Sequence, residues 1–209
     1  MHHTKSNNTI VAAFDFDGTI TYCDTLIPFL VFVAGKLSFA KRLAPLIPQY
    51  LAYKCGRISN QVAKEAFLSA YLQGMSYAQL QLLGEEFSKS VLPRLVRHQM
   101  SARISWHKSQ RHTCILVSAS LDVYLKAWAL LNGFDDVISS QLETDYRGFI
   151  TGKINGRNCY GEEKARRLKD WLSTRKVGCL YGYGDSRGDL AMLQVADVKW
   201  YKGTPFGIR

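Results

Sequence analysis

Thr9-Ile-Val-Ala-Ala-Phe-Asp-Phe-Asp-Gly-Thr19 is the stretch of sequence that decides the fold. Its first six residues form an apolar run that stops at Asp15, which predicts a buried strand over Thr9–Phe14. The run does not alternate with polar residues, which is typical of parallel strands covered on both faces. Gly18 lets the chain turn sharply after the strand. Asp15 and Asp17 can then point into one crevice at its carboxyl end, although two acids in such a loop are also common in a solvated turn.

Strands and helices alternate through much of the remaining chain. Apolar runs predict strands over Thr113–Val117, Val137–Ser139, Val177–Tyr183 and Val198–Tyr201. Helical patterns with end signals predict helices over Leu121–Asn132, Glu162–Thr174 and Leu190–Ala196. Glycines punctuate β-prone residues between Glu143 and Cys159, which predicts a hairpin or flap beside the sheet. The alternation predicts an α/β fold, with a Rossmann-like parallel sheet core and helices on both faces.

Residues 24–90 do not fit this alternation, because they read as helices throughout. We interpret them as an inserted all-helical cap domain, and residues 9–23 and 91–209 as the α/β core domain. Within the insert, Ser59-Asn60 can cap a helix that ends near Gln73-Gly74. Ser76 can cap another helix, with Gln79 in the capping-box position. The stretch Leu92–Gln110 is expected to be the core helix that leads into the second strand.

Composition supports a globular chain of one domain with a large insertion. The 209 residues are 47% hydrophobic and 21% charged, close to the average of about 45–50% and about 25%. Five cysteines without zinc-binding spacing favour reduced thiols in the cytosol. No apolar run reaches the roughly 18 residues of a spanning helix, and Met1–Asn8 reads as a polar tail without the apolar core of a secretion signal. We therefore expect a cytoplasmic protein.

Polar residues also follow the other predicted strands, and they favour a functional site over a solvated turn for Asp15 and Asp17. Ser118 offers a hydroxyl beside a helix start, which suits an anion, although it can also be a helix N-cap. Lys164 lies in the first turn of a helix, where the dipole disfavours a cation, so it is either a surface lysine or the partner of an anion. Asp185 and Asp189 follow the third of these strands. Four acids at one sheet edge repel one another, and all-oxygen ligands favour Mg²⁺ over zinc.

Four short motifs in sequence order carry a resemblance to a known family. They are DFDGT at residues 15–19, a serine at the end of the second strand, GEEK at 161–164 and GYGDSRGDLAML at 182–193. A chain with this order resembles the haloacid dehalogenase-like phosphatase superfamily over about residues 10–201. The position and size of the insert resemble its helical-cap, phosphoserine phosphatase-like subclass (IB). The resemblance implies a Mg²⁺-dependent phosphomonoester hydrolase that works through an aspartyl-phosphate intermediate.

The resemblance also implies roles for individual residues. Asp15 would be the nucleophile, and Asp17 would be the general acid and then the base. The metal ligands would be Asp15, Asp185 and the backbone carbonyl of Asp17. Asp189 would orient a metal-bound water and the side chain of Lys164.

Residues around the transferred phosphoryl group complete the implied site. Ser118 and Lys164 would hold its oxygens, together with backbone N–H groups of Phe16, Asp17 and Ala119. Thr19 would brace the loop. An acid at position 17 separates this pattern from the dehalogenases that give the superfamily its name.

The substrate is the point at which the sequence offers alternatives. Relatives specific for phosphoserine carry a Glu nine residues after the nucleophile, where this chain has Asp24, and a cap Arg where the nearest cation here is Lys64. Between Thr25 and Lys64 there are six bases and no acid, among apolar and aromatic residues. Such a segment can lie on an anionic membrane face, or its apolar side can pack inward.

Three function classes follow from these observations. The first is a phosphatase that acts on a lipid or other amphiphilic phosphate, with peripheral contact at the inner face of the membrane. The second is a phosphatase of phosphoserine or another small metabolite. The third is an anion-binding protein without turnover, which the net charge of +10 suggests. No nucleic-acid-binding motif is present, so no nucleic-acid partner is expected.

Overall fold

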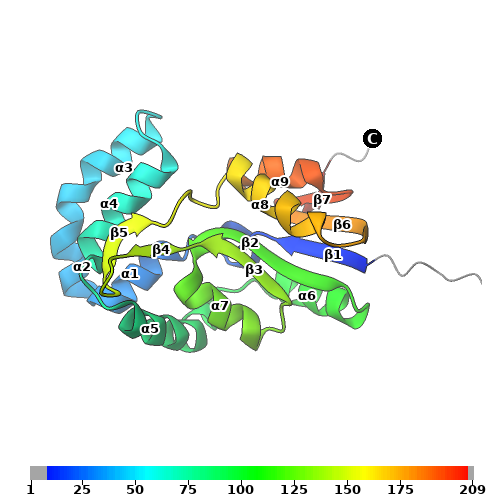
Figure 1. Cartoon of the computed structure of the whole chain (residues 1–209), viewed down its shortest axis with the longest axis horizontal. Coiled ribbons are helices and arrows are strands. Elements are labelled where there is room, and N and C mark those ends of the chain that lie inside the picture. Colours follow the sequence, from blue (N-terminus) through cyan, green and yellow to red (C-terminus); the bar gives the residue numbers. More distant parts are fainter. Residues whose placement is uncertain (1–8, 207–209) are drawn as a thin grey trace, which may run out of the picture.

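A six-stranded sheet forms the centre of the protein in the computed structural model, which describes residues 9–206 (Figure 1). The strand order is β3-β2-β1-β6-β7-β8, and all neighbours are parallel except β7 and β8. The strands are β1 (Thr9–Phe14), β2 (Thr113–Leu121), β3 (Asp136–Ser140), β6 (Val177–Gly184), β7 (Val198–Tyr201) and β8 (Thr204–Pro205). The predicted α/β fold is confirmed. The tail expected at Met1–Asn8 lies outside the described residues, as does the end of the predicted core domain beyond residue 206.

Helices cover both faces of this sheet (Figure 1). The helices α6 (His98–Ser109) and α7 (Asp122–Leu131) lie on one face, and α8 (Glu162–Ser173) and α9 (Leu190–Val195) lie on the other. Successive residues of β1 are buried on alternate faces, because side chains of a strand point to opposite sides. Phe14 belongs to the core under α6 and α7, and Ala13 belongs to the core under α8 and α9. This double coverage explains the uninterrupted apolar run.

Five of the six α-helices between β1 and β2 gather beyond one end of the sheet (Figure 1). They are α1 (Leu26–Ala34), α2 (Lys36–Leu43), α3 (Ile47–Lys54), α4 (Asn60–Leu72) and α5 (Tyr77–Ser90). A buried aromatic cluster of Phe29, Phe87 and Tyr124 joins α1 and α5 to α7. At Gly84 a Cβ atom would collide with the backbone carbonyl of Val123, so this position lets α5 approach α7 closely. The assignment of residues 24–90 to a separate cap domain stays a prediction.

The hairpin is a separate two-stranded antiparallel sheet of β4 (Leu142–Thr144) and β5 (Ile150–Ile154). The hairpin itself was predicted, but its position differs from the expectation, because it packs against α4 rather than beside the large sheet (Figure 1). Backbone hydrogen bonds join Ile150 to Gly74 and Met75, which follow α4. The hairpin therefore extends the helical end of the molecule.

Of the two helix caps predicted in the insert, one is present and the other is absent. Ser59 caps α4 as expected, with its hydroxyl accepting a hydrogen bond from the Val62 N–H at 3.2 Å. Ser76 precedes α5, but its side chain makes no capping hydrogen bond, and the predicted capping box is wrong. Ser76 lies opposite Phe149 in an isolated bridge, whose hydrogen bonds join the neighbouring Met75 and Tyr77 to the hairpin. This tertiary contact replaces the local cap.

The helix predicted over Leu92–Gln110 is also shorter than expected, because α6 begins only at His98. Leu92–Arg94 forms a single 3₁₀ turn. Val96 then pairs with Thr21 in an isolated bridge, which draws the chain into an extended conformation beside the loop after β1.

The strand β2 is longer than predicted. It continues past Val117 to Leu121, with a register shift against β3.

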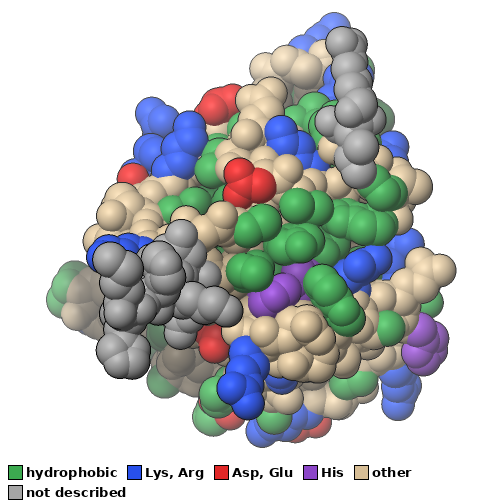
Figure 2. Space-filling view, turned by 90° about the vertical axis from the view of Figure 1, so that its right-hand side faces the viewer, with side chains coloured by type: hydrophobic (Ala, Val, Ile, Leu, Met, Phe, Trp, Pro, Cys, Tyr) green, Lys and Arg blue, Asp and Glu red, His purple; other side chains and the backbone are tan. Residues whose placement is uncertain are grey.

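The end of the molecule away from α1–α5 presents a cluster of hydrophobic side chains with histidine among them (Figure 2). Nearby in the fold, the buried His107 lies between two partners, with Nε2 at 2.7 Å from the Tyr183 hydroxyl and Nδ1 at 2.8 Å from His112 Nδ1. Burial lowers the pKa of His107 to about 4, so its ring is neutral near pH 7.

Among residues 9–206, no helix has the length and apolar character needed to cross a membrane.

Candidate active site

Asp15 begins the candidate site, at the point where β1 ends in the middle of the sheet. Its backbone N–H still donates to the carbonyl of Tyr183 in β6 at 2.9 Å, so the residue is fixed to the neighbouring strand. The chain then turns through Phe16–Ile20, and Gly18 has a φ of 76°. A Cβ atom at Gly18 would overlap the carboxylate of Asp185, so glycine serves both the left-handed backbone and the close approach.

Lys164 is buried and joins two of the acids. Its Nζ donates to Asp15 Oδ1 at 2.7 Å and to Asp189 Oδ1 at 2.5 Å. Burial disfavours the charge on Lys164, but the two carboxylates outweigh this effect and raise its pKa. Burial likewise acts to raise the pKa of Asp189, and Lys164 with the Ser186 groups holds it below its usual value. Lys164 is therefore a fixed cation next to Asp15, and the reading of it as a surface lysine is wrong.

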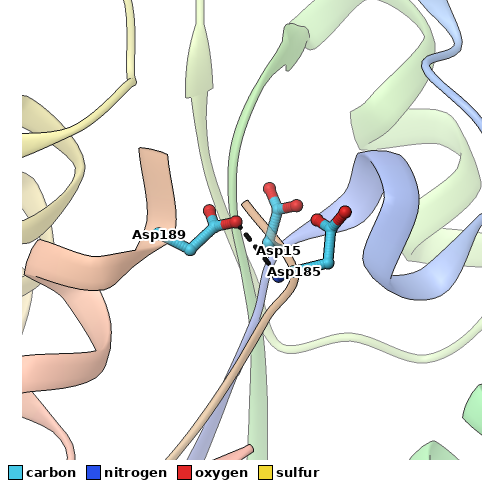
Figure 3. A group of neighbouring side chains, drawn as sticks. All are labelled: Asp15, Asp185 and Asp189. Atoms are coloured by element: carbon cyan, nitrogen blue, oxygen red, sulfur yellow. Dashed lines mark hydrogen bonds between the residues drawn. The ribbon is translucent and has the colours of Figure 1, made fainter. Parts of the chain in front are cut away.

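Three carboxyl groups meet at this point (Figure 3). One oxygen each of Asp15, Asp185 and Asp189 lies within 4.8 Å of the other two. The Thr19 hydroxyl lies between two of them, at 3.3 Å from Asp15 Oδ2 and 3.1 Å from Asp185 Oδ1. Burial raises the pKa of Asp185, and the nearby charge of Asp189 raises it further. Three mutually repelling carboxylates that share a single lysine fit a hard divalent cation such as Mg²⁺.

Asp189 is held by the turn that follows β6. Its Oδ2 accepts hydrogen bonds from the backbone N–H of Asp185 at 3.2 Å and from that of Ser186 at 2.9 Å. The Ser186 hydroxyl adds a third bond at 2.7 Å. These contacts occupy one carboxylate oxygen and leave the other for Lys164, so Asp189 positions the lysine and the start of the loop at once.

Asp17 stands apart from the three clustered acids. Its Oδ1 accepts from the Thr25 N–H at 2.9 Å and from the Thr25 hydroxyl at 2.6 Å, and its Oδ2 accepts from the Ser120 hydroxyl at 2.6 Å. Burial is the main reason that the pKa of Asp17 is raised, to about 7, and Asp24 adds to the effect. Its side chain is therefore suited to exchanging a proton near neutral pH, and only its backbone carbonyl is left for the predicted metal role.

The remaining predicted phosphate-binding residues occupy different places. Ser118 is buried at the edge of the cavity, and its hydroxyl lies 3.2 Å from that of Ser120. It does not cap a helix, because Leu121 precedes α7. Ala119 also lines the cavity. Phe16 is fully buried, and its ring packs against Trp128 with ring centroids 4.9 Å apart, so only its backbone is available to a ligand.

A cavity of about 410 Å³ opens over these groups and extends to the helices α1, α3 and α4. Apolar and aromatic side chains form a large part of its lining: Leu26, Ile27, Tyr50, Tyr53, Ala63, Phe67 and Tyr160. Asp24 lines the cavity as well, but it is exposed, and its Oδ1 accepts a hydrogen bond from the Leu26 N–H at 2.8 Å. The structure thus brings Asp24 to the cavity without bringing it to the acid cluster.

Three residues around the site received no role from the sequence, and two of them, Lys64 and Ser120, line the cavity. Lys64 projects from α4 and donates to the backbone carbonyl of Ala119 and to Asn158 Oδ1. Burial lowers its pKa to about 8, although Asp17 and Asp24 oppose this shift. Thr25 and Ser120 hold Asp17. Ser118 and Ser120 are two residues apart on a strand, so their side chains lie on the same face, and this spacing could have predicted Ser120 as a site residue. No local pattern marks Thr25.

Comparison with known proteins agrees with the fold and the motif order. The family model described as haloacid dehalogenase-like hydrolase matches residues 12–194. The chain is 32% identical to protein CicA of Caulobacter vibrioides over 194 residues, which cover 92% of this chain and 86% of CicA. It is 25% identical over 195 residues to a histidinol-phosphatase of Neisseria meningitidis serogroup C, with 88% and 86% of the two chains covered.

Two solved structures share the fold. A protein of unknown function from Bordetella pertussis gives a TM-score of 0.78 at 24% identity, over 92% of this chain and 89% of that one. The phospho-aspartyl intermediate analogue of phosphoserine phosphatase gives a TM-score of 0.64 at 17% identity, over 92% and 85% of the two chains.

Proposed function

Since the chain belongs to the haloacid dehalogenase-like hydrolase family, we propose that it is a phosphatase that hydrolyses phosphomonoesters through an aspartyl-phosphate at Asp15. The observation that carries the proposal is the environment of the Asp15 carboxylate. One of its oxygens is held by Lys164, and an oxygen of each of Asp185 and Asp189 lies within 4.8 Å. This arrangement gives a nucleophile at a fixed position with positive charge beside it, which is what phosphoryl transfer requires.

In the first step a carboxylate oxygen of Asp15 attacks the phosphorus atom. The bond between Asp15 and phosphorus forms as the ester bond to the leaving oxygen breaks, and Asp17 gives its proton to that oxygen. In the second step Asp17 takes a proton from water, the water oxygen attacks phosphorus, and the carboxylate of Asp15 is released with inorganic phosphate. Lys164 and the Ser118 hydroxyl bind the phosphoryl oxygens in both steps.

Asp15 and Asp185 would hold a magnesium ion, with the backbone carbonyl of Asp17. When bound, the ion supplies positive charge that neutralises the carboxylates and the phosphoryl oxygens. The residues of the chain do the rest. Asp189 keeps Lys164 in place, and Thr19 fixes the separation of Asp15 and Asp185.

The role of Asp17 predicts a dependence on the leaving group. With Asp17→Asn, hydrolysis of an alkyl phosphate such as glycerol phosphate should fall by about 10²- to 10⁴-fold, because the alkoxide needs the proton. Para-nitrophenolate leaves without a proton, so para-nitrophenyl phosphate should give a burst of about one equivalent followed by slow turnover. Rapid-quench kinetics measures this burst. Asp170→Asn, at an exposed acid on α8, is the matched control and should show no such change, whereas an equal loss on both substrates without a burst would contradict the role.

For the substrate we propose an amphiphilic phosphomonoester, for example a lysophosphatidate or a phosphatidylglycerol phosphate. A large part of the cavity lining is aliphatic and aromatic. The helices next to the cavity also expose apolar side chains. The helix α3 has no buried residue, and Leu37 of α2 and Ile47 and Leu51 of α3 are 80%, 49% and 55% exposed. Lys36, Lys41, Arg42, Lys54 and Arg57 are also exposed there, whereas Lys64 lies in the cavity. This surface suits an anionic membrane.

A substrate panel tests the proposal and its alternative. Phosphate release is measured from para-nitrophenyl phosphate, lysophosphatidate, phosphoserine and histidinol phosphate with Mg²⁺ present. Asp24 and Lys64 offer an acid and a base to an amino-acid-like leaving group, which is the second candidate. Preference for lysophosphatidate supports the amphiphile, and preference for either amino compound supports the small-metabolite phosphatase. No release from any ester would favour an anion-binding protein without turnover.

Membrane contact is tested separately with liposomes. Binding should rise with anionic lipid and fall with salt, because salt screens exposed charges. Each base contributes on the order of 1 kcal/mol near such a surface, so Lys36→Gln with Lys41→Gln should weaken binding by about thirtyfold. Arg42 is left unchanged because it donates to the Ala70 carbonyl. Lys169→Gln with Lys176→Gln removes the same charge elsewhere and should have little effect. Equal binding of both double variants would refute the membrane contact.

A further inference from the structure

A second cavity, of about 620 Å³, borders the candidate active site. The two cavities share Gly18 and Asp185 in their walls. Thr19 and the end of β6 also line the second cavity, and the rest of its wall comes from Arg97, the first half of α6 and the segment from Trp200 to Gly203 at the end of β7. The phosphatase mechanism described above uses none of the side chains from Arg97, α6 or the segment Trp200 to Gly203.

The charge of this second cavity is opposite to that of the first. Arg97, Arg103 and Lys202 line it, and Asp185 is the acidic residue in its wall. Within the part of the chain that the structure describes, none of the three bases has a carboxylate within salt-bridge distance. The carboxylate of Asp185 is already engaged with the Thr19 hydroxyl and the other acids. The cavity therefore keeps a net positive charge.

The two arginines are held in place by neutral groups. Arg97 donates from Nε to the backbone carbonyl of Thr21 at 2.9 Å. The guanidinium of Arg103 lies over the ring of Trp200, 4.3 Å from its centroid, and Trp200 in turn stacks on Tyr183 with ring centroids 6.2 Å apart. Stacked or backbone-bound guanidinium groups keep N–H donors for a ligand, and little side-chain freedom remains to be lost on binding.

We propose that this cavity binds a small anion with more than one phosphate group. Arginine forks match phosphate oxygens in pairs, and three bases balance the charge of a diphosphate better than that of a single carboxylate. The volume is also large enough for an organic part beside the phosphates. The candidate active site gathers acids and needs a divalent cation before it accepts a phosphate, whereas this cavity binds its anion without metal.

Nuclear magnetic resonance of metal-free, ¹⁵N-labelled protein tests the proposal with inorganic pyrophosphate as the probe. The indole N–H of Trp200 is the reporter, identified with Trp200→Phe, because Trp200 lines the second cavity and no tryptophan lines the first. Its resonance should shift saturably at low salt. Arg103→Gln with Lys202→Asn should weaken binding by at least about tenfold, since charge-assisted hydrogen bonds are lost. Asn is chosen because Lys202 has a φ of 52°, which Asn tolerates.

Lys169→Gln with Lys176→Gln is the control, because it removes the same charge from exposed positions outside the cavity. It should bind pyrophosphate like the wild type. The single exposed substitution Lys202→Asn serves if the double variant does not fold, and it should still weaken binding. An unshifted Trp200 resonance at millimolar pyrophosphate, or equal weakening by the control, overturns the proposal. Neither result bears on phosphatase activity, which is measured on para-nitrophenyl phosphate.

Discussion

Replacing Asp15 by Asn should lower phosphatase turnover by at least about a thousandfold while the fold is kept, because the covalent route disappears with the carboxylate. Asn has the same shape, and Lys164 keeps its second partner, Asp189. Burial acts to raise the pKa of Asp15, and although Lys164 opposes this, the value lies at about 7. The substitution also removes one of the two carboxylates that compensate the buried charge of Lys164, so a melting curve has to show that the fold is kept.

The measurement is steady-state hydrolysis of para-nitrophenyl phosphate with a melting curve for each protein. Asp170→Asn is the matched control, because Asp170 is an exposed acid on α8, and it should keep full activity. Beryllofluoride, a mimic of the phosphoryl group, should raise the melting temperature of the wild type and not that of Asp15→Asn. Near-normal turnover in Asp15→Asn would rule out Asp15 as the nucleophile.

Removal of divalent cations should abolish activity, and Mg²⁺ should restore it. Without a cation the carboxylates of Asp15, Asp185 and Asp189 share only Lys164. Excess Ca²⁺ should inhibit, because it accepts higher coordination and can engage both oxygens of a carboxylate. Asp185→Ala should reproduce the effect of chelation.

A melting curve gives a second readout that does not depend on turnover. Mg²⁺ should stabilise the wild type by mass action, since a ligand that binds only the folded state raises its stability. The shift should be lost in Asp185→Ala and kept in Asp170→Asn. Full activity after exhaustive chelation, or an undiminished shift in Asp185→Ala, would contradict the proposed magnesium site.

The sequence predicted the elements that depend on local pattern. The runs Thr9–Phe14 and Val198–Tyr201 are strands with those bounds, because their apolar residues pack on both faces, buried in the first run and partly buried in the second. The order of the motifs predicted which acids follow which strands. Parallel strands place their carboxyl ends at one edge, so the gathering of Asp15, Asp185 and Asp189 follows from topology.

The errors arise where tertiary contacts override local signals. Ser76 has a capping sequence, but the Tyr77 N–H at the start of α5 donates to the Gly148 carbonyl of the hairpin loop, and the Ser76 side chain makes no cap. Val96 lies within the helix predicted over Leu92–Gln110, but it forms a bridge with Thr21 instead. Lys64 reaches the cavity and Thr25 reaches Asp17 from the helical segment, and their positions depend on how that segment packs on the sheet. No pattern along the chain contains that information.

The central place of β1 has a consequence for how the protein acquires its shape. Val11 pairs with Thr113 on one side and with Leu180 on the other. The strand β1 is synthesised first, but its partners β2 and β6 follow roughly one hundred or more residues later. Pairing between such distant segments slows folding. During synthesis its apolar faces and open edges remain available to other chains. We expect the short-range helical segment to form early, and the nucleophile to reach its final position only when β6 is added.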